Sequence, residues 1–246
     1  MAFYDKSVAK PYGKAYRLPQ VIFLDAMGTL FNLKHSVGEI YQQLALKYNV
    51  QTDADLLNKA FIHCYKSAPP LAFSQRELTS ITQQEFMWWK NVVKTTFEQV
   101  EAFDRFSNFT VFFAELYAYF ATREPWYVYP DVIPCLNSWQ QQGIELGVIS
   151  NFDTRLDPIL KALDLERFLT SITISSVAGF AKPDQNIFEI ALKKHGLMAQ
   201  QAWHIGDDRS CDYLGAKNVG INAFWLNRDN RSQNIENQLP NLSSLG

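Results

Sequence analysis

The chain has 246 residues, of which 47% are hydrophobic and 20% are charged, and this ordinary globular composition excludes a largely disordered or low-complexity protein. Its length exceeds that of one average domain and falls short of two. The 23 basic and 25 acidic residues leave a net charge of -2 without a long basic run, so we expect no nucleic-acid partner.

Targeting signals and cysteine spacing set the expected cellular context. Residues 1–20 carry charged side chains with Pro11 and Gly13, in place of the continuous apolar stretch of a signal peptide. Later apolar runs are interrupted by charge before about 18 residues accumulate, the length that a membrane span requires. The cysteines lie too far apart for a zinc motif or a disulfide framework. We therefore expect a cytoplasmic protein with no membrane partner.

The first regular element is predicted at Val21–Leu24, a short apolar run that ends at Asp25 and Gly28. This pattern is typical of a buried strand followed by a tight turn. Residues 36–122 then show helical periodicity and contain no convincing strand. We expect a helical insert after the first strand.

Two capping-box patterns predict where helices of the insert begin. Ser36 with Glu39, and Thr82 with Glu85, have the spacing in which both side chains cap the first helical turn. Apolar residues then recur at intervals of three and four, as on one face of a helix, and their aromatic members are expected to pack within a small bundle. The three stripes are Val37, Ile40, Tyr41, Leu44 and Tyr48; Phe86, Trp89, Val93 and Phe97; and Phe109, Phe112, Phe113, Leu116 and Phe120.

Strand and helix patterns alternate in the second half of the chain. This alternation implies the α/β class, with a doubly wound, mostly parallel sheet covered on both faces. The end of the chain, residues 227–246, is rich in Asn and Gln and is expected to be a loose tail. Strands are predicted at 144–149, 171–175, 202–205 and 221–226, and helices at 131–142, 154–163, 184–195 and 209–219.

Acidic residues directly follow two of the predicted strands. Asp25 ends the first strand, and Asp207 and Asp208 follow the strand at 202–205, with Asp212 one helical turn beyond. The carboxyl ends of parallel strands border the crevice in which such sheets bind ligands. Crowded carboxylates repel one another, and an all-oxygen site suits Mg²⁺ better than zinc. A magnesium site is therefore predicted at this edge of the sheet.

Two other predicted strand ends supply groups that complement an anion. Ser150 and Asn151 follow the strand at 144–149, and Lys182 lies in the loop after the strand at 171–175. A hydroxyl, an amide and an ammonium beside a metal form a cradle for phosphate. The expected partner is a small phosphorylated molecule.

These strand ends, taken together, resemble the signatures of the haloacid dehalogenase-like hydrolase superfamily, and they occur in the same order. Only the interval from 25 to 150 can hold an extra domain, which is similar to the subgroup with a helical cap after the first strand. The resemblance implies a Rossmann-like core at 1–32 and 126–246 and a helical cap at 33–125. The matching segments are Asp25-Ala26-Met27-Gly28-Thr29-Leu30, Ser150-Asn151, Lys182-Pro183-Asp184 and Gly206-Asp207-Asp208 with Asp212.

The resemblance also implies roles for single residues. Asp25 is the implied nucleophile, which would form a phosphoaspartyl intermediate that water then cleaves. The implied Mg²⁺ ligands are Asp25, the backbone carbonyl of Met27, Asp207 and Asp208. The other implied roles are catalysis for Lys182 and Thr29, phosphate binding for Ser150, Asn151 and Lys182, and support of the site for Gly28 and Asp212.

The first loop departs from the phosphatase pattern of the superfamily at Met27. Phosphatases usually carry a second Asp at this position, which acts as general acid and base. A thioether cannot donate a proton, and such assistance contributes about 10²–10⁴ in rate. We therefore expect low activity on alkyl phosphates and the least impairment on acyl phosphates, whose leaving group departs without protonation.

Two alternative functions stay open. The loop also resembles that of 2-haloacid dehalogenases, which lack the second Asp. Dehalogenases, however, replace the second acidic group, carry a Tyr where this chain has Phe188, and have an arginine early in the cap, whereas no arginine occurs here between Asp25 and Arg76. The other alternative is a catalytically weak member that binds a phosphorylated ligand or a protein partner.

Several other side chains are weaker candidates. His35 follows the first loop and is an alternative acid, although a surface histidine is the commoner case. His204 is expected in the core, and Cys211 is expected to be a structural thiol. The arginines of the insert, which are expected to be solvated, are Arg76, Arg105 and Arg123.

Overall fold

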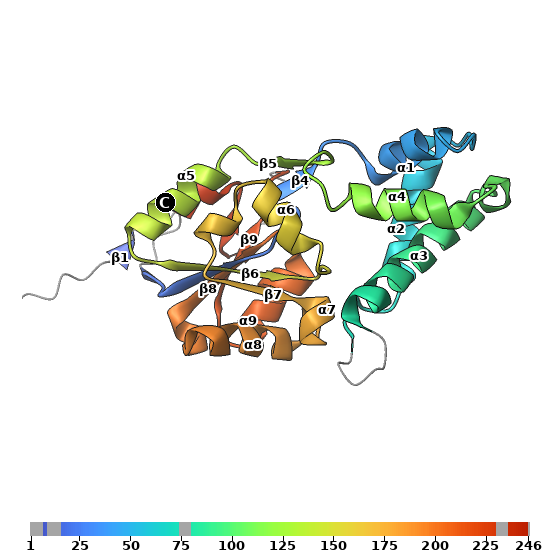
Figure 1. Ribbon diagram of the computed structural model, residues 1–246. Coiled ribbons are helices and arrows are strands. Elements are labelled where there is room, and N and C mark those ends of the chain that lie inside the picture. Colours follow the sequence, from blue (N-terminus) through green and yellow to red (C-terminus); the bar gives the residue numbers. More distant parts are fainter. Residues whose placement is uncertain (1–6, 9–15, 74–79, 230–235, 246) are drawn as a thin grey trace, which may run out of the picture.

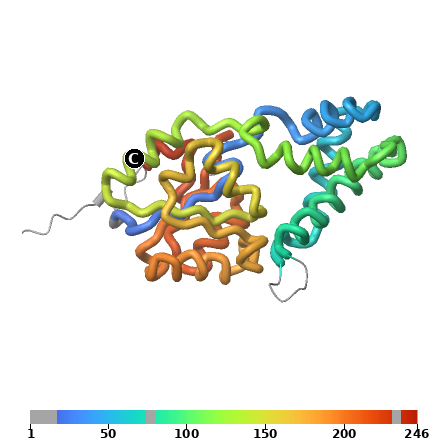
Figure 2. The backbone as a smooth tube through the Cα atoms, viewed as in Figure 1, coloured from blue at the N-terminus to red at the C-terminus, as the bar shows by residue number. Residues whose placement is uncertain are grey.

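The computed structural model describes residues 7–8, 16–73, 80–229 and 236–245. An α/β core and a helical cap lie side by side (Figure 1). The chain leaves the core through one segment and returns through a second segment close to the first (Figure 2). Arg76 lies outside the described residues, so its predicted position at the surface of the cap is not described.

The core is built on a six-stranded sheet whose strand pairs are all parallel. The predicted α/β class and doubly wound sheet are therefore confirmed. The five predicted strands are present with ends within one residue or so, and a sixth short strand joins them. In spatial order the strands are β10 (Gln238–Leu239), β9 (Asn222–Leu226), β8 (Ala202–Gly206), β3 (Val21–Leu24), β6 (Glu145–Ser150) and β7 (Ser171–Ile174).

Strand register brings the predicted site residues to one level. Leu24 at the end of β3 pairs with Val148 of β6 on one side and with Ile205 of β8 on the other. The Asp25 amide then donates to the Ile205 carbonyl at 2.9 Å. Because all three strands run in the same direction, the residues that follow them emerge at the same edge of the sheet.

Helices cover both faces of the sheet, and the alternating side chains of β3 show why. Ile22 and Leu24 pack in one buried cluster, and Val21 and Phe23 pack in another on the opposite face. The first cluster is covered by α5 (Val132–Gln141), α6 (Leu156–Ala162) and the short η5 (Leu242–Leu245). The second is covered by α8 (Gln185–His195), the π-helical turn η4 (Arg209–Leu214) and α9 (Gly215–Asn218). Shorter elements are η2 (Glu166–Phe168), α7 (Ser175–Ala178) and η3 (Ala199–Gln201).

The cap contains its own hydrophobic cluster, to which all three predicted stripes contribute. No strand occurs among its described residues from 36 to 73 and from 80 to 122, as predicted. An antiparallel ribbon of β4 (Phe31–Leu33) and β5 (Trp126–Val128) joins the cap to the core. The predicted domain boundaries fall in this ribbon and stay a prediction. The helices are α1 (Val37–Leu46), α2 (Ala54–Ser67), α3 (Ile81–Gln99), η1 (Phe103–Arg105) and α4 (Phe109–Tyr119).

One predicted capping box is confirmed and the other is wrong. Ser36 accepts from the Glu39 amide, and the Glu39 carboxylate accepts from the Ser36 amide. Helix α3, however, begins after Ser80, whose hydroxyl accepts from the Gln83 amide. Glu85 lies one turn further on, is fully buried and bonds to the core instead. A serine two residues earlier was free to cap the helix, and this released Glu85 for a tertiary contact.

The expectation of a loose tail is wrong for residues 236–245. Strand β10 pairs with β9, and Leu239 and Leu242 are buried against the core. The Leu242 amide donates to the Asp131 carboxylate at 2.8 Å. Apolar residues spaced three apart outweigh the polar composition, because they find an open sheet edge and a helix to cover. At the other end, β1 (Ser7–Val8) and β2 (Tyr16–Arg17) form a small antiparallel ribbon.

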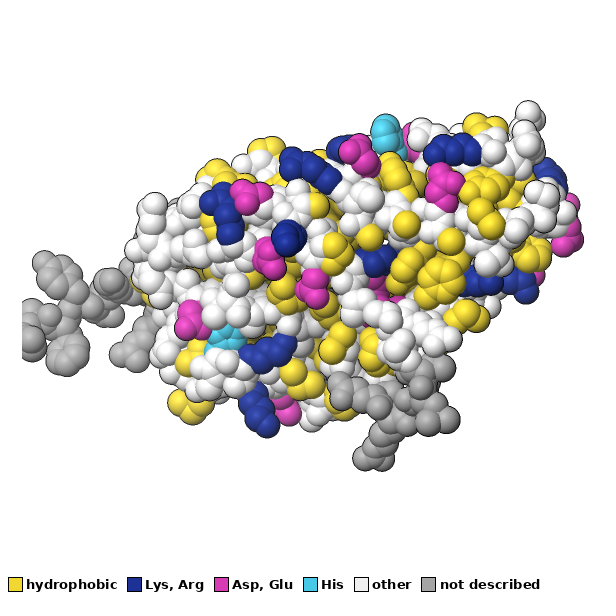
Figure 3. All heavy atoms as spheres, in the orientation of Figure 1, with side chains coloured by type: hydrophobic (Ala, Val, Ile, Leu, Met, Phe, Trp, Pro, Cys, Tyr) yellow, Lys and Arg dark blue, Asp and Glu magenta, His cyan; other side chains and the backbone are white. Residues whose placement is uncertain are grey.

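The helices and one face of the surface show the features expected from the hydrophobic and charged composition. No helix of the described residues is both long enough and apolar enough to cross a membrane. On the face shown in Figure 3, basic and acidic side chains are interspersed, and several hydrophobic side chains gather at the boundary between core and cap. That boundary contains the cavity described next.

Candidate active site

A buried cluster of charged side chains lies at the carboxyl edge of the sheet, and we call Asp25, Lys182, Asp212 and His204 the strand-end network. The Lys182 ammonium donates to Asp25 Oδ1 and to Asp212 Oδ1, each at 2.6 Å, and to the Ile149 carbonyl at 2.8 Å. The three charged residues are at most 7% exposed. One cation thus serves two carboxylates out of contact with bulk water.

The two carboxyl groups that share the Lys182 ammonium differ in pKa. Burial raises the pKa of Asp25 to about 6, although Lys182 pulls it down. Burial acts in the same direction on Asp212, but Lys182 and His204 outweigh it and hold the pKa of Asp212 well below its usual range. Asp212 is therefore the permanent counterion of Lys182, whereas Asp25 keeps a basic and reactive carboxylate.

His204 lies within the sheet, as predicted for a core residue, and it also contacts the network. Its Nε2 lies 2.9 Å from Asp212 Oδ1. Burial lowers the pKa of His204, so the imidazole is neutral and its Nε2–H donates to the carboxylate. Its ring packs edge to face against Phe188, the residue at the position where dehalogenases carry a Tyr.

The first loop approaches the loop after β8 so closely that one position requires glycine. Gly28 has a φ of +91°, and a Cβ there would lie 2.4 Å from a carboxylate oxygen of Asp207. The Thr29 hydroxyl, which is fully buried, lies 3.4 Å from the same carboxylate. Gly28 and Thr29 therefore lie directly against Asp207. The supporting role of Gly28 and the catalytic role of Thr29 stay predictions.

Asp207 is an exposed residue that lines the cavity. Desolvation there, followed by the charges of Asp25 and Asp212, raises the pKa of Asp207 to about 8. Oxygens of Asp25, Asp207 and Asp212 lie within 4.8 Å of one another. This crowding of carboxylate oxygens around a single lysine fits a hard cation that prefers oxygen ligands.

Asp208 lines the same cavity but is engaged elsewhere. Its Oδ1 accepts from the amides of Ser210 and Cys211 at 2.8 and 2.7 Å, which makes it the cap of η4. Burial, and then the charges of Asp208 and Asp212, raise the pKa of the Cys211 thiol to about 12. Cys211 therefore stays protonated. The metal role predicted for Asp208 stays a prediction, and the carboxylate that lies with those of Asp25 and Asp207 is that of Asp212.

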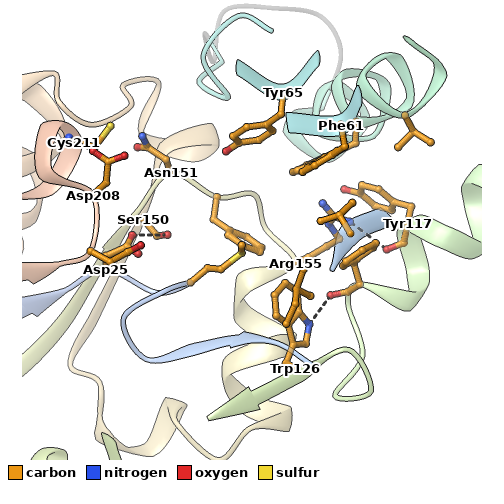
Figure 4. A pocket seen from close by; sticks show the side chains of 18 of the residues that line it. Asp25, Phe61, Tyr65, Tyr117, Trp126, Ser150, Asn151, Arg155, Asp208 and Cys211 are labelled. Carbon is orange, nitrogen blue, oxygen red and sulfur yellow. Dashed lines mark hydrogen bonds between the residues drawn. The ribbon is translucent and has the colours of Figure 1, made fainter. Parts of the chain in front are cut away.

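The two predicted phosphate-binding residues at the end of β6, Ser150 and Asn151, have different contacts at the site. The Ser150 hydroxyl donates to Asp25 Oδ1 at 3.2 Å and faces the cavity (Figure 4). The Asn151 side chain donates to the Lys182 carbonyl at 2.8 Å and accepts from the Lys182 amide at 2.7 Å. This pair of bonds favours a role for Asn151 in positioning Lys182.

The remaining sequence candidates divide between the cavity and the surface. Met27 lines the cavity and is 41% exposed. His35 is exposed and does not line the cavity. Arg105 donates to the Gln51 carbonyl and Arg123 to the Ala162 carbonyl, both away from the cavity. Neither His35 nor the two arginines lie beside Asp25, where the missing acid would be.

A second group of polar side chains, buried or half-buried, joins the cap to the core. We call Glu85, Trp89, Asp153, Thr154, Arg155 and Ser176 the cap–core network. Glu85 of α3 accepts from the Thr154 amide at 2.9 Å and from the hydroxyls of Thr154 and Ser176 at 2.5 and 2.6 Å. Trp89 Nε1 donates to Asp153 at 2.5 Å. Arg155 donates to the same carboxylate through Nε and Nη2. These bonds hold the cap over the strand ends.

The sequence did not indicate this second network. Glu85 matched a capping pattern, and Asp153 and Arg155 follow β6 without a metal-ligand or catalytic motif. The available signal was a set of charged residues next to the Ser150-Asn151 segment, but their partners on α3 are more than sixty residues away in the chain. Pairing over such a separation is decided by the packing of cap on core.

A parallel doubly wound sheet with carboxylates at its strand ends and a helical insert after the first strand defines a class of Rossmann-like hydrolases with caps. This chain belongs to the haloacid dehalogenase-like hydrolase family, because the family profile matches residues 19–220. The predicted resemblance is therefore confirmed.

Similar proteins agree with this assignment. The chain is 32% identical over 212 residues to haloacid dehalogenase-like hydrolase domain-containing protein 3 of Danio rerio, covering 84% of each chain. A phosphatase of the superfamily from Thermococcus onnurineus has a TM-score of 0.62 at 21% identity, covering 93% of this chain and 96% of that one. An L-2-haloacid dehalogenase from Xanthobacter autotrophicus has a TM-score of 0.69 at 14% identity, covering 93% and 97%. Proteins that share this fold thus include a phosphatase and a dehalogenase, so the fold alone does not distinguish these two activities.

Proposed function

We propose that the protein is a Mg²⁺-dependent hydrolase of a small phosphorylated metabolite, with Asp25 as the nucleophile. The observation that carries this proposal is the surroundings of Asp25, whose Oδ1 accepts from Lys182 and Ser150 and whose carboxylate lies close to those of Asp207 and Asp212. Two donors and an acidic cluster around one carboxylate fit a phosphoryl group with its metal better than they fit a carbon–halogen bond.

In the first step Asp25 attacks the phosphorus atom, and the bond from phosphorus to the leaving group breaks. The product is a phosphoaspartyl group on Asp25, and water then attacks the same phosphorus to release phosphate and regenerate the carboxylate. Lys182 and Ser150, which contact Asp25 in the free protein, would each turn a donor to the phosphoryl oxygens. Asp212 keeps Lys182 charged throughout, because its own pKa is held low.

The residues present fit Mg²⁺. Asp25 and Asp207 would hold the ion, with the carbonyl of Met27 as the backbone ligand and with Asp208 or Asp212 on its acidic side. When bound, the ion supplies positive charge against the phosphoryl oxygens.

The leaving group distinguishes the substrates that this site favours. Met27 occupies the position of the usual acid, and His35 lies outside the cavity. A leaving group that departs as a stable anion needs no proton, so the site favours acyl phosphates over alkyl phosphates.

A 2-haloacid dehalogenase is the second candidate, supported by Met27 and by the structural similarity to the Xanthobacter enzyme. The acidic cluster opposes it, because an incoming haloacid carboxylate would add negative charge beside Asp207 and Asp212, and Lys182 is already paired with Asp25 and Asp212. A binding protein without turnover is the third candidate and would use the same contacts.

A panel assay tests these candidates. Release of phosphate from acetyl phosphate and glycerol phosphate, and of chloride from 2-chloropropionate, is measured with Mg²⁺ and with EDTA. We expect phosphate release that requires Mg²⁺ and is faster from acetyl phosphate. Chloride release in EDTA would establish the dehalogenase instead, and binding of phosphate without turnover of any substrate would favour the binding protein.

A further inference from the structure

The cavity above Asp25 continues far beyond the space that a phosphate group needs. It has a volume of ≈ 440 Å³ and extends from the strand ends into the cap, where all four long cap helices contribute to its wall. Figure 4 shows Asp25, Ser150 and Asp208 at one end, and Phe61, Tyr117 and Trp126 at the other. Pockets for small molecules commonly have volumes of about 300–1,000 Å³. The distal part, which we call the cap chamber, is therefore large enough for the organic part of a substrate.

The wall of the cap chamber is aromatic and aliphatic. Phe61, Trp89, Phe113 and Trp126 contribute rings, and Val37, Leu116 and other aliphatic side chains fill the space between them. Such a wall favours apolar groups and stacks against planar rings. It offers few hydrogen bonds to a sugar or another polyhydroxylated group, whose desolvation would go uncompensated.

Among the described residues, one arginine lines the chamber, and its charge is already paired. Arg155 donates to Asp153 through Nε and Nη2, at 2.8 and 2.6 Å, and Asp153 is fully buried. The guanidinium also lies 3.9 Å from the ring centre of Tyr117 and 5.1 Å from that of Trp89. A second anionic group on the substrate would therefore find no unpaired cation among the described residues of the chamber.

Tyr41 supplies a phenolic hydroxyl to the cavity wall, which Tyr65 and Tyr117 also line. The Tyr41 residue is 2% exposed. Burial raises the pKa of Tyr41, so the hydroxyl stays protonated. A neutral hydroxyl in the wall of an apolar chamber can form a hydrogen bond with a polar atom of a ligand without adding charge.

We propose that the cap chamber selects a monophosphate whose organic part is uncharged, aromatic and about the size of one or two rings. This proposal rests on the phosphate-directed function proposed above and specifies its substrate class. The phosphoryl group lies against Asp25 and Lys182, the ring lies among the aromatic side chains of the cap, and Tyr41 contacts a single polar substituent. An aromatic acyl phosphate combines this body with a leaving group that needs no acid.

Binding of two phosphonates tests the chamber without requiring turnover. Benzylphosphonate and methylphosphonate carry the same anionic group, and only the first carries a ring. In the presence of Mg²⁺ we expect benzylphosphonate to bind at least about tenfold more tightly, as measured by calorimetry, because its ring leaves water for an apolar wall. Equal affinities, or tighter binding of methylphosphonate, would overturn the proposal, as would the absence of binding by either compound.

A matched pair of variants locates the effect. Val37→Trp places an indole in the chamber, whereas Val111→Trp adds the same side chain at a position that is 51% exposed on α4. We expect Val37→Trp to remove the preference for benzylphosphonate and Val111→Trp to retain it. A preference that survives Val37→Trp would place the ring elsewhere and overturn the proposal.

Hydrolysis of benzoyl and acetyl phosphate separates this proposal from the proposed function. If acetyl phosphate is cleaved but benzylphosphonate has no binding advantage, the function stands and the chamber proposal fails. If benzylphosphonate binds more tightly but neither acyl phosphate is cleaved, the chamber proposal stands and the hydrolase function fails. If both stand, kcat/KM for benzoyl phosphate exceeds that for acetyl phosphate through a lower KM.

Discussion

The strand-end network and the cap–core network are both built on buried carboxylates, yet their charges are balanced differently. In the first, Lys182 is shared between Asp25 and Asp212 while Asp207 lies close by. In the second, Asp153 has its own arginine, and Glu85 accepts from three neutral donors. Carboxylates in excess of cations attract a metal and a phosphoryl group, whereas saturated carboxylates hold two parts of a protein together. The following variants test this difference.

The largest effect is expected for Asp25→Asn. The amide cannot attack phosphorus, so acyl phosphate hydrolysis should fall at least about 10³-fold. Stability should not fall with it. Because the folded pKa of Asp25 is raised to about 6, the folded state disfavours ionised Asp25, and the resulting loss of stability develops as the pH rises from about 4 to about 6. At neutral pH in EDTA, the variant should therefore melt at the same or a higher temperature than the parent protein.

The activity assay and thermal melts at pH 5 and pH 7.5 check this pair of outcomes together. Full activity would remove Asp25 as the nucleophile. A lower melting temperature at pH 7.5 would mean that ionised Asp25 stabilises the folded state, which contradicts a raised pKa.

The next largest effect is expected for Met27→Asp, which adds an acid facing the cavity. General acid catalysis of this kind contributes about 10²–10⁴ in rate, so hydrolysis of glycerol phosphate should rise by about 10²-fold. Acetyl phosphate hydrolysis, in which the leaving group needs no proton, should change much less. Met27→Asn is the control of matched size. An equal increase with the asparagine variant would attribute the gain to shape or polarity.

In the cap–core network, Glu85→Ala removes the shared acceptor of three donors. Thr154 and Ser176 would be left unsatisfied at the boundary between cap and core, and we expect a loss of about 3 kcal/mol in the free energy of unfolding. Glu115→Ala removes another paired carboxylate of the cap, but one bonded to Lys47 and Tyr48 at the surface. We expect that control to lose about 1 kcal/mol or less.

Urea denaturation of the two variants measures the difference. Equal losses would mean that Glu85 adds nothing beyond an ordinary surface pair and that the cap is held by its apolar contacts alone.

The smallest effect is expected for Trp89→Phe, which deletes one donor to Asp153 and keeps most of the ring. Asp153 retains Arg155 as its partner, so the loss should be about 1–2 kcal/mol. Trp88→Phe is a close control, because the Trp88 indole donates to the Pro69 carbonyl at an exposed position. Denaturation curves should show a larger loss for Trp89. If the two losses are equal, the bond to Asp153 adds no stability at the cap–core boundary.

Local patterns were sufficient for the sheet and for the reactive end of the site. Val21–Leu24 is a strand because four apolar residues precede Asp25 and a turn, and Asp207 follows β8 for the same reason. Once these strands are parallel and adjacent, their carboxyl ends must lie together, so Asp25, Ser150, Lys182 and Asp207 could be grouped before their distances were known. The absence of the second Asp was equally visible, because the sequence shows directly that Met27 occupies its position in the first loop.

The tail and Glu85 show where local patterns fail. Residues 236–245 are polar enough to suggest a free end, but Leu239 meets the open edge of the neighbouring strand β9, and Leu242 meets the distant segment that begins α5. Glu85 fits a capping box locally, but Ser80 caps α3 and the core supplies three donors. In both cases a partner far along the chain offered more than the local choice.

The sequence by itself determined the order of strands and helices, the residues at the strand ends and the missing acid, because each depends on neighbours within one or two turns. The tertiary structure alone decided which carboxylates share Lys182, how the cap is held, and that its aromatic stripes leave a chamber open towards Asp25. Those properties depend on contacts between segments far apart in the chain, whose geometry is set only when the cap packs against the core.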